Sequence, residues 1–223
     1  MSKTPASSPQ SPVLSPQSPA PGPGVLFVIS APSGAGKTTI FRELLCRQPD
    51  LRESVSYTTR SMRAGERDGI DYHFVSCEQF DRMVGEGAFV EWAEVHGNRY
   101  GTARTTLQQA SAEGCDVLLD IDVQGAAQLR DSGLAGVFVF ILPPSMATLR
   151  QRLSGRNTDS AEVIEQRMRN ATGEIRQAVR FDYIVINEEL ERAVATVQAI
   201  VMAERVRGNW VIERLPAEFG LKS

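Results

Sequence analysis

A short glycine-rich stretch near the start of the chain has the residue types and spacing of a phosphate-binding loop. Residues 31–38 are APSGAGKT, which match the pattern G-x-x-x-x-G-K-[ST] except that Ala31 replaces the first glycine. Glycines let backbone N–H groups converge on phosphate oxygens, and a helix that begins here adds its positive end. Lys37 can then reach the β- and γ-phosphates, and Thr38 can offer its hydroxyl to Mg²⁺. The predicted contacts to a nucleoside triphosphate come from consecutive residues: Ser33, Gly34, Ala35, Gly36, Lys37, Thr38 and Thr39.

Lysine is rare in this chain, which makes its presence in the loop informative. Of the 24 basic residues, only Lys3, Lys37 and Lys222 are lysines, and two of these lie near the chain ends. A compact ammonium suits a phosphate cradle that a bulky, fork-shaped guanidinium would not fit. We therefore predict that Lys37 is a catalytic cation.

An acidic pair follows a second apolar run and could hold a metal ion. Residues 117–121 are VLLDI, which predicts a buried strand that carries Asp120, with Asp122 two residues later on the same side. An acid in this position beside a phosphate loop is expected to hold Mg²⁺ or its water. Because an acid at a strand end is often only a turn residue, the assignment of Asp120 depends on its lying next to the loop.

Residues 54–102 differ from the rest in being rich in Tyr, Thr, Arg and Gly. Arg60 and Arg63 lie three residues apart in a polar segment, and the arginine fork binds phosphate through two parallel hydrogen bonds. Tyr72 and Tyr100 could add hydroxyl donors. A solvated basic loop is the alternative, but its position beside a phosphate loop favours a second phosphate site.

The chain resembles guanylate kinases of the nucleoside monophosphate kinase family over residues 26–204. The resemblance rests on the segments APSGAGKTT, SVSYTTRSMRAGE, GIDYHFVS, FVEWAEVHGNRYGT, LLDIDVQGA and FILPPS. It implies transfer of a phosphoryl group from ATP to GMP, and also to dGMP, with Mg²⁺. It also implies an α/β fold: a P-loop parallel sheet flanked by helices, with a small mixed-β insert that binds GMP and a helical lid.

The resemblance further implies a role for individual residues. The GMP phosphate would be held by Arg60, Arg63, Tyr72 and Tyr100. Guanine would be recognised by Ser56, Glu91, Thr102 and Asp122. The lid and the helix after it would place Arg152, Arg156 and Arg167 on the ATP phosphates, and Asn187 would lie near the adenine end.

The chemistry of guanine supports the role of Glu91. Guanine presents two adjacent donors, N1–H and N2–H₂, and a carboxylate can accept both, whereas adenine would turn a bare N1 acceptor toward it. No general base is needed, because the attacking oxygen of GMP's phosphate is already ionised at neutral pH. The protein must instead align two polyanions and neutralise their repulsion, which explains an arginine-rich site.

Hydrophobic periodicity supplies the elements that position these residues. It predicts strands over residues 25–29, 117–121, 137–142 and 183–186, and helices over 37–46, 77–85, 107–113, 145–153, 161–179 and 189–207. Strands alternating with helices indicate a parallel sheet. We expect a core of residues 25–53, 103–144 and 168–207, a GMP-binding insert of 54–102, a lid of 145–167 and a C-terminal extension of 208–223. Residues 1–24, with seven prolines and six serines, predict a disordered tail.

Composition excludes several classes. The 223 residues carry a formal net charge of −3, which disfavours a nucleic-acid-binding protein. Their apolar runs are too short to span a membrane, and three scattered cysteines fit a reducing, cytoplasmic compartment. The sequence leaves a homo-oligomer open.

Two other functions remain as alternatives. Residues 122–125 fit the DxxG pattern of GTPase switches, but no Asn-Lys-x-Asp guanine motif follows. A catalytically inactive guanylate-kinase-like module that binds proteins would be expected to have lost parts of the phosphate loop, whereas Lys37 and Thr38 are present.

Overall fold

The computed structural model describes residues 24–95, 97–155, 160–212, 215 and 219–221. Nearly all of the predicted tail therefore lies outside the described residues, and so does Arg156. Within the described part, no helix is both long and apolar enough to cross a membrane.

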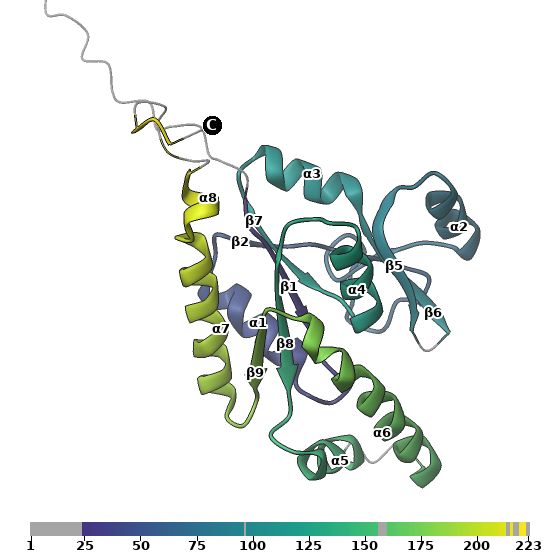
Figure 1. Ribbon diagram of the computed structural model, residues 1–223. Coiled ribbons are helices and arrows are strands. Elements are labelled where there is room, and N and C mark those ends of the chain that lie inside the picture. Colours follow the sequence, from purple (N-terminus) through teal and green to yellow (C-terminus); the bar gives the residue numbers. More distant parts are fainter. Residues whose placement is uncertain (1–23, 96, 156–159, 213–214, 216–218, 222–223) are drawn as a thin grey trace, which may run out of the picture.

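A five-stranded parallel sheet forms the centre of the molecule (Figure 1). Its strands, in spatial order, are β2 (Leu51–Glu53), β7 (Asp116–Asp120), β1 (Leu26–Ser30), β8 (Val137–Leu142) and β9 (Tyr183–Ile186). Every neighbouring pair is parallel. The central strand β1 is buried along its whole length, as its continuous apolar sequence predicts for a strand covered on both faces.

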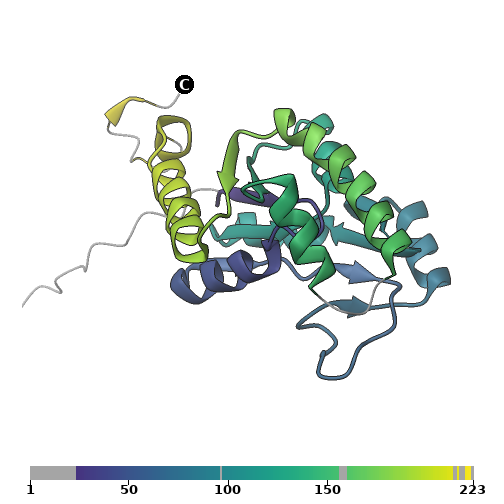
Figure 2. The same ribbon diagram turned by 90° about the horizontal axis from the view of Figure 1, so that it is seen from below.

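Two layers of helices cover this sheet (Figures 1 and 2). Helices α1 (Lys37–Arg47) and α7 (Leu190–Arg205) pack on one face, where Phe41 and Val197 belong to one buried cluster. Helices α3 (Arg104–Ala112) and α4 (Val123–Asp131) contribute Ala110 and Leu129 to the cluster on the other face. The predicted α/β class, with a parallel sheet between helices, is confirmed.

The insert forms a second, mixed sheet. Its strands, in spatial order, are β4 (His73–Phe74), β3 (Tyr57–Thr58), β6 (Asn98–Ala103) and β5 (Phe89–Val95). Helix α2 (Cys77–Gly85) begins at Ser76, whose side chain accepts the backbone N–H of Gln79. It buries Phe80 against Phe89, with ring centroids 4.6 Å apart. The insert thus has a small aromatic core of its own.

Two helices lie beyond the carboxyl ends of the central strands. Helices α5 (Met146–Ser154) and α6 (Ala161–Arg176) share a small cluster that includes Leu149 and Met168. A short 3₁₀ helix, Gln177–Arg180, follows α6, and α8 (Gly208–Ile212) follows α7. The predicted boundary between lid and core at residue 167 therefore falls inside one continuous helix.

Several elements differ from the sequence-based expectation, and three of them have a clear physical reason or position. Strand β2 has one apolar residue, Leu51, so it lacks the alternation of apolar and polar residues by which a strand is predicted. Helix α4 was not predicted, because a glycine and alanines weaken its apolar stripe; its start is marked instead by Asp122, which accepts the N–H of Gly125. Helix α3 begins at Arg104 rather than at residue 107, directly after strand β6.

Candidate active site

The phosphate-binding loop joins β1 to α1 at the carboxyl edge of the parallel sheet. Gly34 and Gly36 have φ values of 90° and 95°, in the left-handed region where side chains are strained. A Cβ at Gly36 would also lie 2.4 Å from Nδ2 of Asn187. The loop therefore needs glycine at these positions, as the sequence pattern implied.

Asn187 and Arg152 support this loop by binding the carbonyl of Ala35. Nδ2 of Asn187 donates to that oxygen over 2.7 Å, and Nη1 of Arg152 donates over 3.2 Å. Nη2 of Arg152 also donates to the backbone oxygen of Asn187 over 3.0 Å. Since Asn187 is only 6% exposed, it fixes the loop from within the protein. These contacts place both residues on the loop's backbone, a role that sequence reasoning did not foresee for either.

Removing this support should weaken ATP binding more than GMP binding. We expect Asn187→Leu, which keeps the size but deletes the donor to Ala35, to raise the KM for ATP about tenfold through a misplaced loop. The KM for GMP should change by less than about threefold, because the substitution acts on the GMP site only indirectly. Steady-state kinetics with each nucleotide varied in turn test this, and an unchanged KM for ATP would contradict it.

The side chain of Lys37 binds two residues at the end of strand β7. Its Nζ donates to the carbonyl of Ile121 over 2.8 Å and forms an ion pair with Asp120. Its side chain is 20% exposed, so it can still reach a ligand. The hydroxyl-bearing Thr38 and Thr39, next in sequence, are exposed. Asp120 therefore does lie next to the loop, which is the condition set for its metal-binding role.

Helix α6 contacts the loop at Ser33. Nη2 of Arg167 donates to Oγ of Ser33 over 2.9 Å, and the backbone N–H of Ser33 donates to Oε2 of Glu174 over 3.2 Å. Arg167, which the resemblance assigns to the ATP phosphates, thus contacts the phosphate loop. Glu174 was not foreseen, because nothing in the sequence brings a residue 141 positions away onto Ser33.

A cleft beside Lys37 joins the loop to the insert. It consists of two hollows of about 220 and 360 Å³. Both hollows are lined by Thr38, Ser56, Tyr72, Tyr100 and Asp120. The first hollow adds Lys37, Glu91 and Asp122, and the second adds Arg60 and Arg63. The structure thus brings together, around one space, nearly all residues predicted to bind GMP.

Arg60 is held at one end of the cleft. Its two terminal nitrogens bind the carboxylate of Glu66 over 3.0 and 2.7 Å, in the fork geometry that arginine also uses for phosphate. Its Cζ lies 5.4 Å from the ring centroid of Tyr72. The same carboxylate accepts the backbone N–H of Arg63 over 2.8 Å. Sequence reasoning missed Glu66, although an acid within six residues of the arginine was a usable signal.

Glu91 occupies the other end of the cleft and is 4% exposed. Its Oε1 accepts the hydroxyl of the fully buried Thr102 over 2.5 Å. Burial raises the pKa of Glu91 to about 7; the Thr102 bond opposes this shift, and the Asp122 carboxylate adds to it. The group is therefore poorly stabilised as an anion until a ligand supplies donors.

Asp122 lies at the same end, where it caps helix α4. Its Oδ1 accepts the N–H of Gly125 over 2.9 Å, and its Oδ2 accepts Nε2 of Gln124 over 3.2 Å. Capping does not use every lone pair of a carboxylate, so Asp122 can still meet a ligand in the cleft that it lines.

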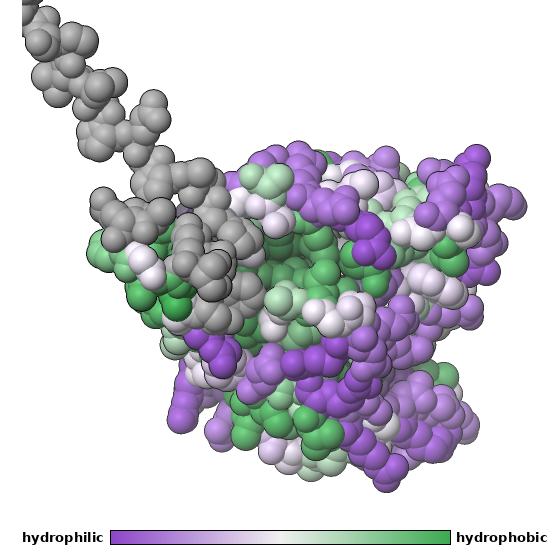
Figure 3. Space-filling view, turned by 45° about the horizontal axis from the view of Figure 1, so that its top comes forward, coloured by the Kyte–Doolittle hydropathy of each residue, from purple (hydrophilic) through white to green (hydrophobic). Residues whose placement is uncertain are grey.

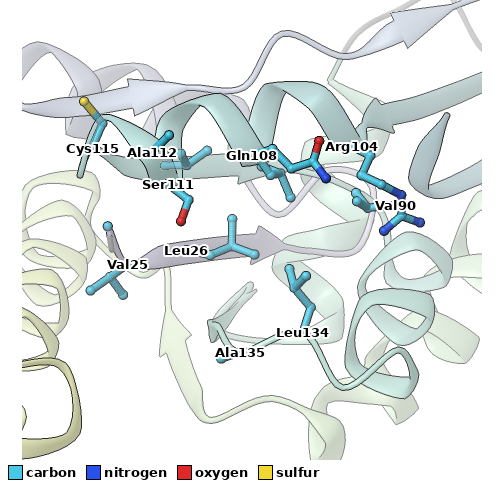
Figure 4. A pocket seen from close by; sticks show the side chains of 13 residues that line it. Val25, Leu26, Val90, Arg104, Gln108, Ser111, Ala112, Cys115, Leu134 and Ala135 are labelled. Carbon is cyan, nitrogen blue, oxygen red and sulfur yellow. The ribbon is translucent and has the colours of Figure 1, made fainter. Parts of the chain in front are cut away.

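A larger hollow of about 580 Å³ lies at the opposite, amino edge of the sheet (Figures 3 and 4). Figure 4 shows Leu26 of β1 facing side chains of α3 across it, with Val25, directly before that strand, at its end. Among the lining residues that the structure describes, only Arg104 is charged, and Nη2 of Arg104 donates to the carbonyl of Phe89. The charged and hydroxyl-bearing residues suited to phosphate recognition are concentrated in the cleft beside Lys37.

Comparison with known proteins decides the family. The guanylate kinase family model matches residues 24–204. The chain belongs to the guanylate kinase family. It is 59% identical over 186 residues to the guanylate kinase of Syntrophotalea carbinolica, covering 83% of this chain and 89% of that one. It is 52% identical over 198 residues to the guanylate kinase of Geobacter metallireducens, covering 89% and 98%. The resemblance drawn from the sequence motifs is confirmed.

A solved guanylate kinase has the same fold. The crystal structure of guanylate kinase from Anaplasma phagocytophilum matches with a TM-score of 0.72 and 34% identity, covering 90% of this chain and 94% of that chain. A guanylate kinase needs two nucleotide sites that face each other. In this chain the loop with Lys37 and the cleft ending at Glu91 lie next to each other.

Proposed function

We propose that this guanylate kinase transfers the γ-phosphoryl group of ATP to the phosphate of GMP. The observation that carries the proposal is the cleft that places a buried carboxylate, Glu91, and the phosphate-loop cation, Lys37, around one space. ATP would bind with its phosphates in the loop of residues 33–39. GMP would bind with guanine at Glu91 and Thr102, and with its phosphate at Arg60, Arg63, Tyr72 and Tyr100.

The residues catalyse by positioning and by charge neutralisation. The attacking oxygen belongs to the phosphate of GMP and is ionised at neutral pH, so no side chain has to remove a proton. Arg60 neutralises the acceptor phosphate, and Lys37 stabilises charge on the transferred group. Arg152 and Arg167 act beside the loop, Arg152 through the carbonyl of Ala35. Ser56 and Asp122 complete the guanine end of the cleft. The role proposed for Arg156 is to act from the lid on the ATP phosphates, and this residue lies outside the described part of the chain.

The donor set beside Lys37 fits Mg²⁺. The hydroxyl of Thr38 and the carboxylate of Asp120 line the same hollows, and Mg²⁺ prefers such hard oxygen ligands together with water and substrate phosphates. Bound there, the ion would supply charge neutralisation between the phosphates of ATP. The chain's own part is to hold these two oxygens beside the loop.

Acceptor selectivity is the decisive measurement. We expect ADP formation from ATP to be supported by GMP with a kcat/KM roughly 10⁴-fold above that of AMP, because AMP leaves the buried polar groups unmatched. CMP and UMP should be equally poor, and dGMP should be accepted because it carries the same base and phosphate. The assay uses the full chain with Mg²⁺. Comparable rates with AMP and GMP would overturn the proposal.

The cysteines and the proposed substrates of the enzyme bear on its compartment and its partners. Cys46, Cys77 and Cys115 are all unpaired thiols, consistent with the reducing cytoplasm predicted from the sequence. The proposed partners are the small molecules ATP and GMP, not a nucleic acid or a membrane.

A further inference from the structure

Helix α4 of the core lies directly against strand β5 of the insert, and one of its side chains is bound to the strand's backbone. Nε2 of Gln128 donates to the carbonyl of Trp92 over 2.7 Å, and the N–H of Trp92 donates to Oε1 of Gln128 over 3.1 Å. This reciprocal pair resembles the bonds that a neighbouring strand would make. Trp92 directly follows Glu91, so the pair fixes the backbone next to the proposed guanine-binding carboxylate.

A second residue of the same helix touches that carboxylate itself. Gly125 lies three positions before Gln128 and therefore on the same helix face. A Cβ at Gly125 would lie 2.3 Å from Oε2 and 3.0 Å from Cδ of Glu91. The backbone of Gly125 does not have a positive φ, so conformation alone does not demand glycine there. The close approach of Glu91 demands it.

The carboxylate of Glu91 is thus fixed on two sides. Oε1 accepts the hydroxyl of Thr102, and Oε2 lies against the main chain of Gly125. Glycine inside a helix lowers helix stability relative to alanine, so its presence here needs a compensating reason. Room for a deeply seated carboxylate is such a reason.

We propose that Gly125 and Gln128 are positioning residues for base selection, which set the depth and orientation of Glu91 from the face of α4. The inference rests on the proposed function, because it assigns Glu91 to guanine. Gly125 acts by leaving space for the carboxylate of Glu91. Gln128 acts by holding strand β5 in the position in which Glu91 reaches that space. Neither residue touches the nucleotide.

Neither residue is needed to hold the helix on the sheet. Helix α4 is anchored by Ala126 and Leu129, which belong to the buried cluster beneath it. Gln128 is exposed, so replacing it opens no cavity in the core. Variants at these two positions should therefore fold, and their effects should concentrate on GMP.

The test compares Gly125→Ala and Gln128→Leu with matched controls in the full-length enzyme. Gly85→Ala makes the same change at a helical glycine of the insert whose added Cβ would meet nothing within 4 Å. Gln109→Leu removes an exposed glutamine that binds only within its own helix, to Glu113 among its described contacts. We expect Gly125→Ala to raise the KM for GMP about 10²-fold and Gln128→Leu about tenfold, with the KM for ATP within about twofold.

Two further readouts separate positioning from general damage. Gly125→Ala should push Glu91 out of its buried position and so lower the raised pKa of Glu91. If protonation of Glu91 weakens GMP binding, the rise in the KM for GMP on acidification should then begin at a lower pH than in the parent. The other ionisable groups facing Glu91 are Asp122 and Lys37, with Asp120, Tyr72 and Tyr100 lining the same hollow, and all are unchanged in the variant. Adding Gly125→Ala to Glu91→Gln should cost little more than Glu91→Gln alone, because both act through one carboxylate.

The outcomes are distinct. A GMP KM within twofold of the parent in Gly125→Ala, an equal rise in both KM values, or additive effects in the double variant would each overturn the inference. If Gly125→Ala does not fold, Gln128→Leu decides by the same criteria. If Glu91→Gln itself leaves the GMP KM unchanged, the proposed function fails; if only the α4 variants are neutral, the positioning role alone fails.

Discussion

Lys37→Met should lower kcat by about 10³-fold or more and leave the fold intact, because a cation that stabilises the transferred phosphoryl group is lost. Methionine keeps the unbranched stem of lysine and removes the charge. The ammonium contacts the carbonyl of Ile121 and the carboxylate of Asp120, and no apolar core depends on it. Because this ion pair is partly exposed, its loss should change the free energy of unfolding by no more than about 1 kcal/mol.

A matched variant separates the effect of the positive charge at position 37 from the effect of the shape of the side chain. Lys37→Arg retains the cation but replaces a compact ammonium with a planar fork, so we expect kcat to fall about 10²-fold. Single-turnover measurements at saturating nucleotides report the chemical step, and thermal unfolding reports the fold. Near-normal turnover of Lys37→Met would remove this lysine from the mechanism.

Glu91→Gln should lower kcat/KM for GMP about 10³-fold, because an amide cannot accept both donors of guanine and turns a donor of its own toward one of them. The KM for ATP should stay close to that of the parent. Thr102 can still donate to the amide oxygen, so the buried hydroxyl keeps a partner. Varying GMP and ATP separately tests this, and an unchanged KM for GMP would contradict the guanine assignment.

The same substitution should stabilise the ligand-free enzyme. The pKa of Glu91 is raised to about 7 in the folded protein from an ordinary 4.5, so its ionised form opposes folding. The stability that the neutral acid provides is fully present below about pH 4.5 and is lost as pH rises through about 7, a difference of about 3 kcal/mol. Glutamine stays neutral, so Glu91→Gln should unfold at a higher denaturant concentration above about pH 8. Destabilisation there would show that the carboxylate is better solvated than its burial indicates.

Local sequence signals predicted the parts of the site that depend on local chemistry. The spacing of Gly34, Gly36 and Lys37 was sufficient for the loop, because each residue acts through its own backbone or charge. Glu91 was assigned through the resemblance to guanylate kinases, and the donor pattern of guanine agrees with that assignment. Continuous apolar runs likewise predicted four strands of the central sheet, since a strand buried on both faces needs them.

Residues that act through tertiary contacts gave no comparable signal. Asn187 supports the carbonyl of Ala35 from 152 positions away, and an asparagine after a strand looks like any turn residue. Glu174 reaches Ser33 only because α6 continues past the expected lid boundary. Gly125 was noted only as part of the DxxG alternative and of the segment LLDIDVQGA, without a role of its own, whereas in the structure a Cβ there would collide with Glu91. Contacts of this kind depend on how elements pack, which periodicity does not specify.

Both principal cations of the site are already matched by acids of the chain itself: Lys37 by Asp120, and Arg60 by Glu66. An incoming phosphate must therefore compete with an internal carboxylate for its cation, so nucleotide binding resembles an ion exchange. A doubly charged phosphoryl end competes better in such an exchange than a singly charged anion. We therefore expect the site to bind polyphosphates in preference to monovalent anions.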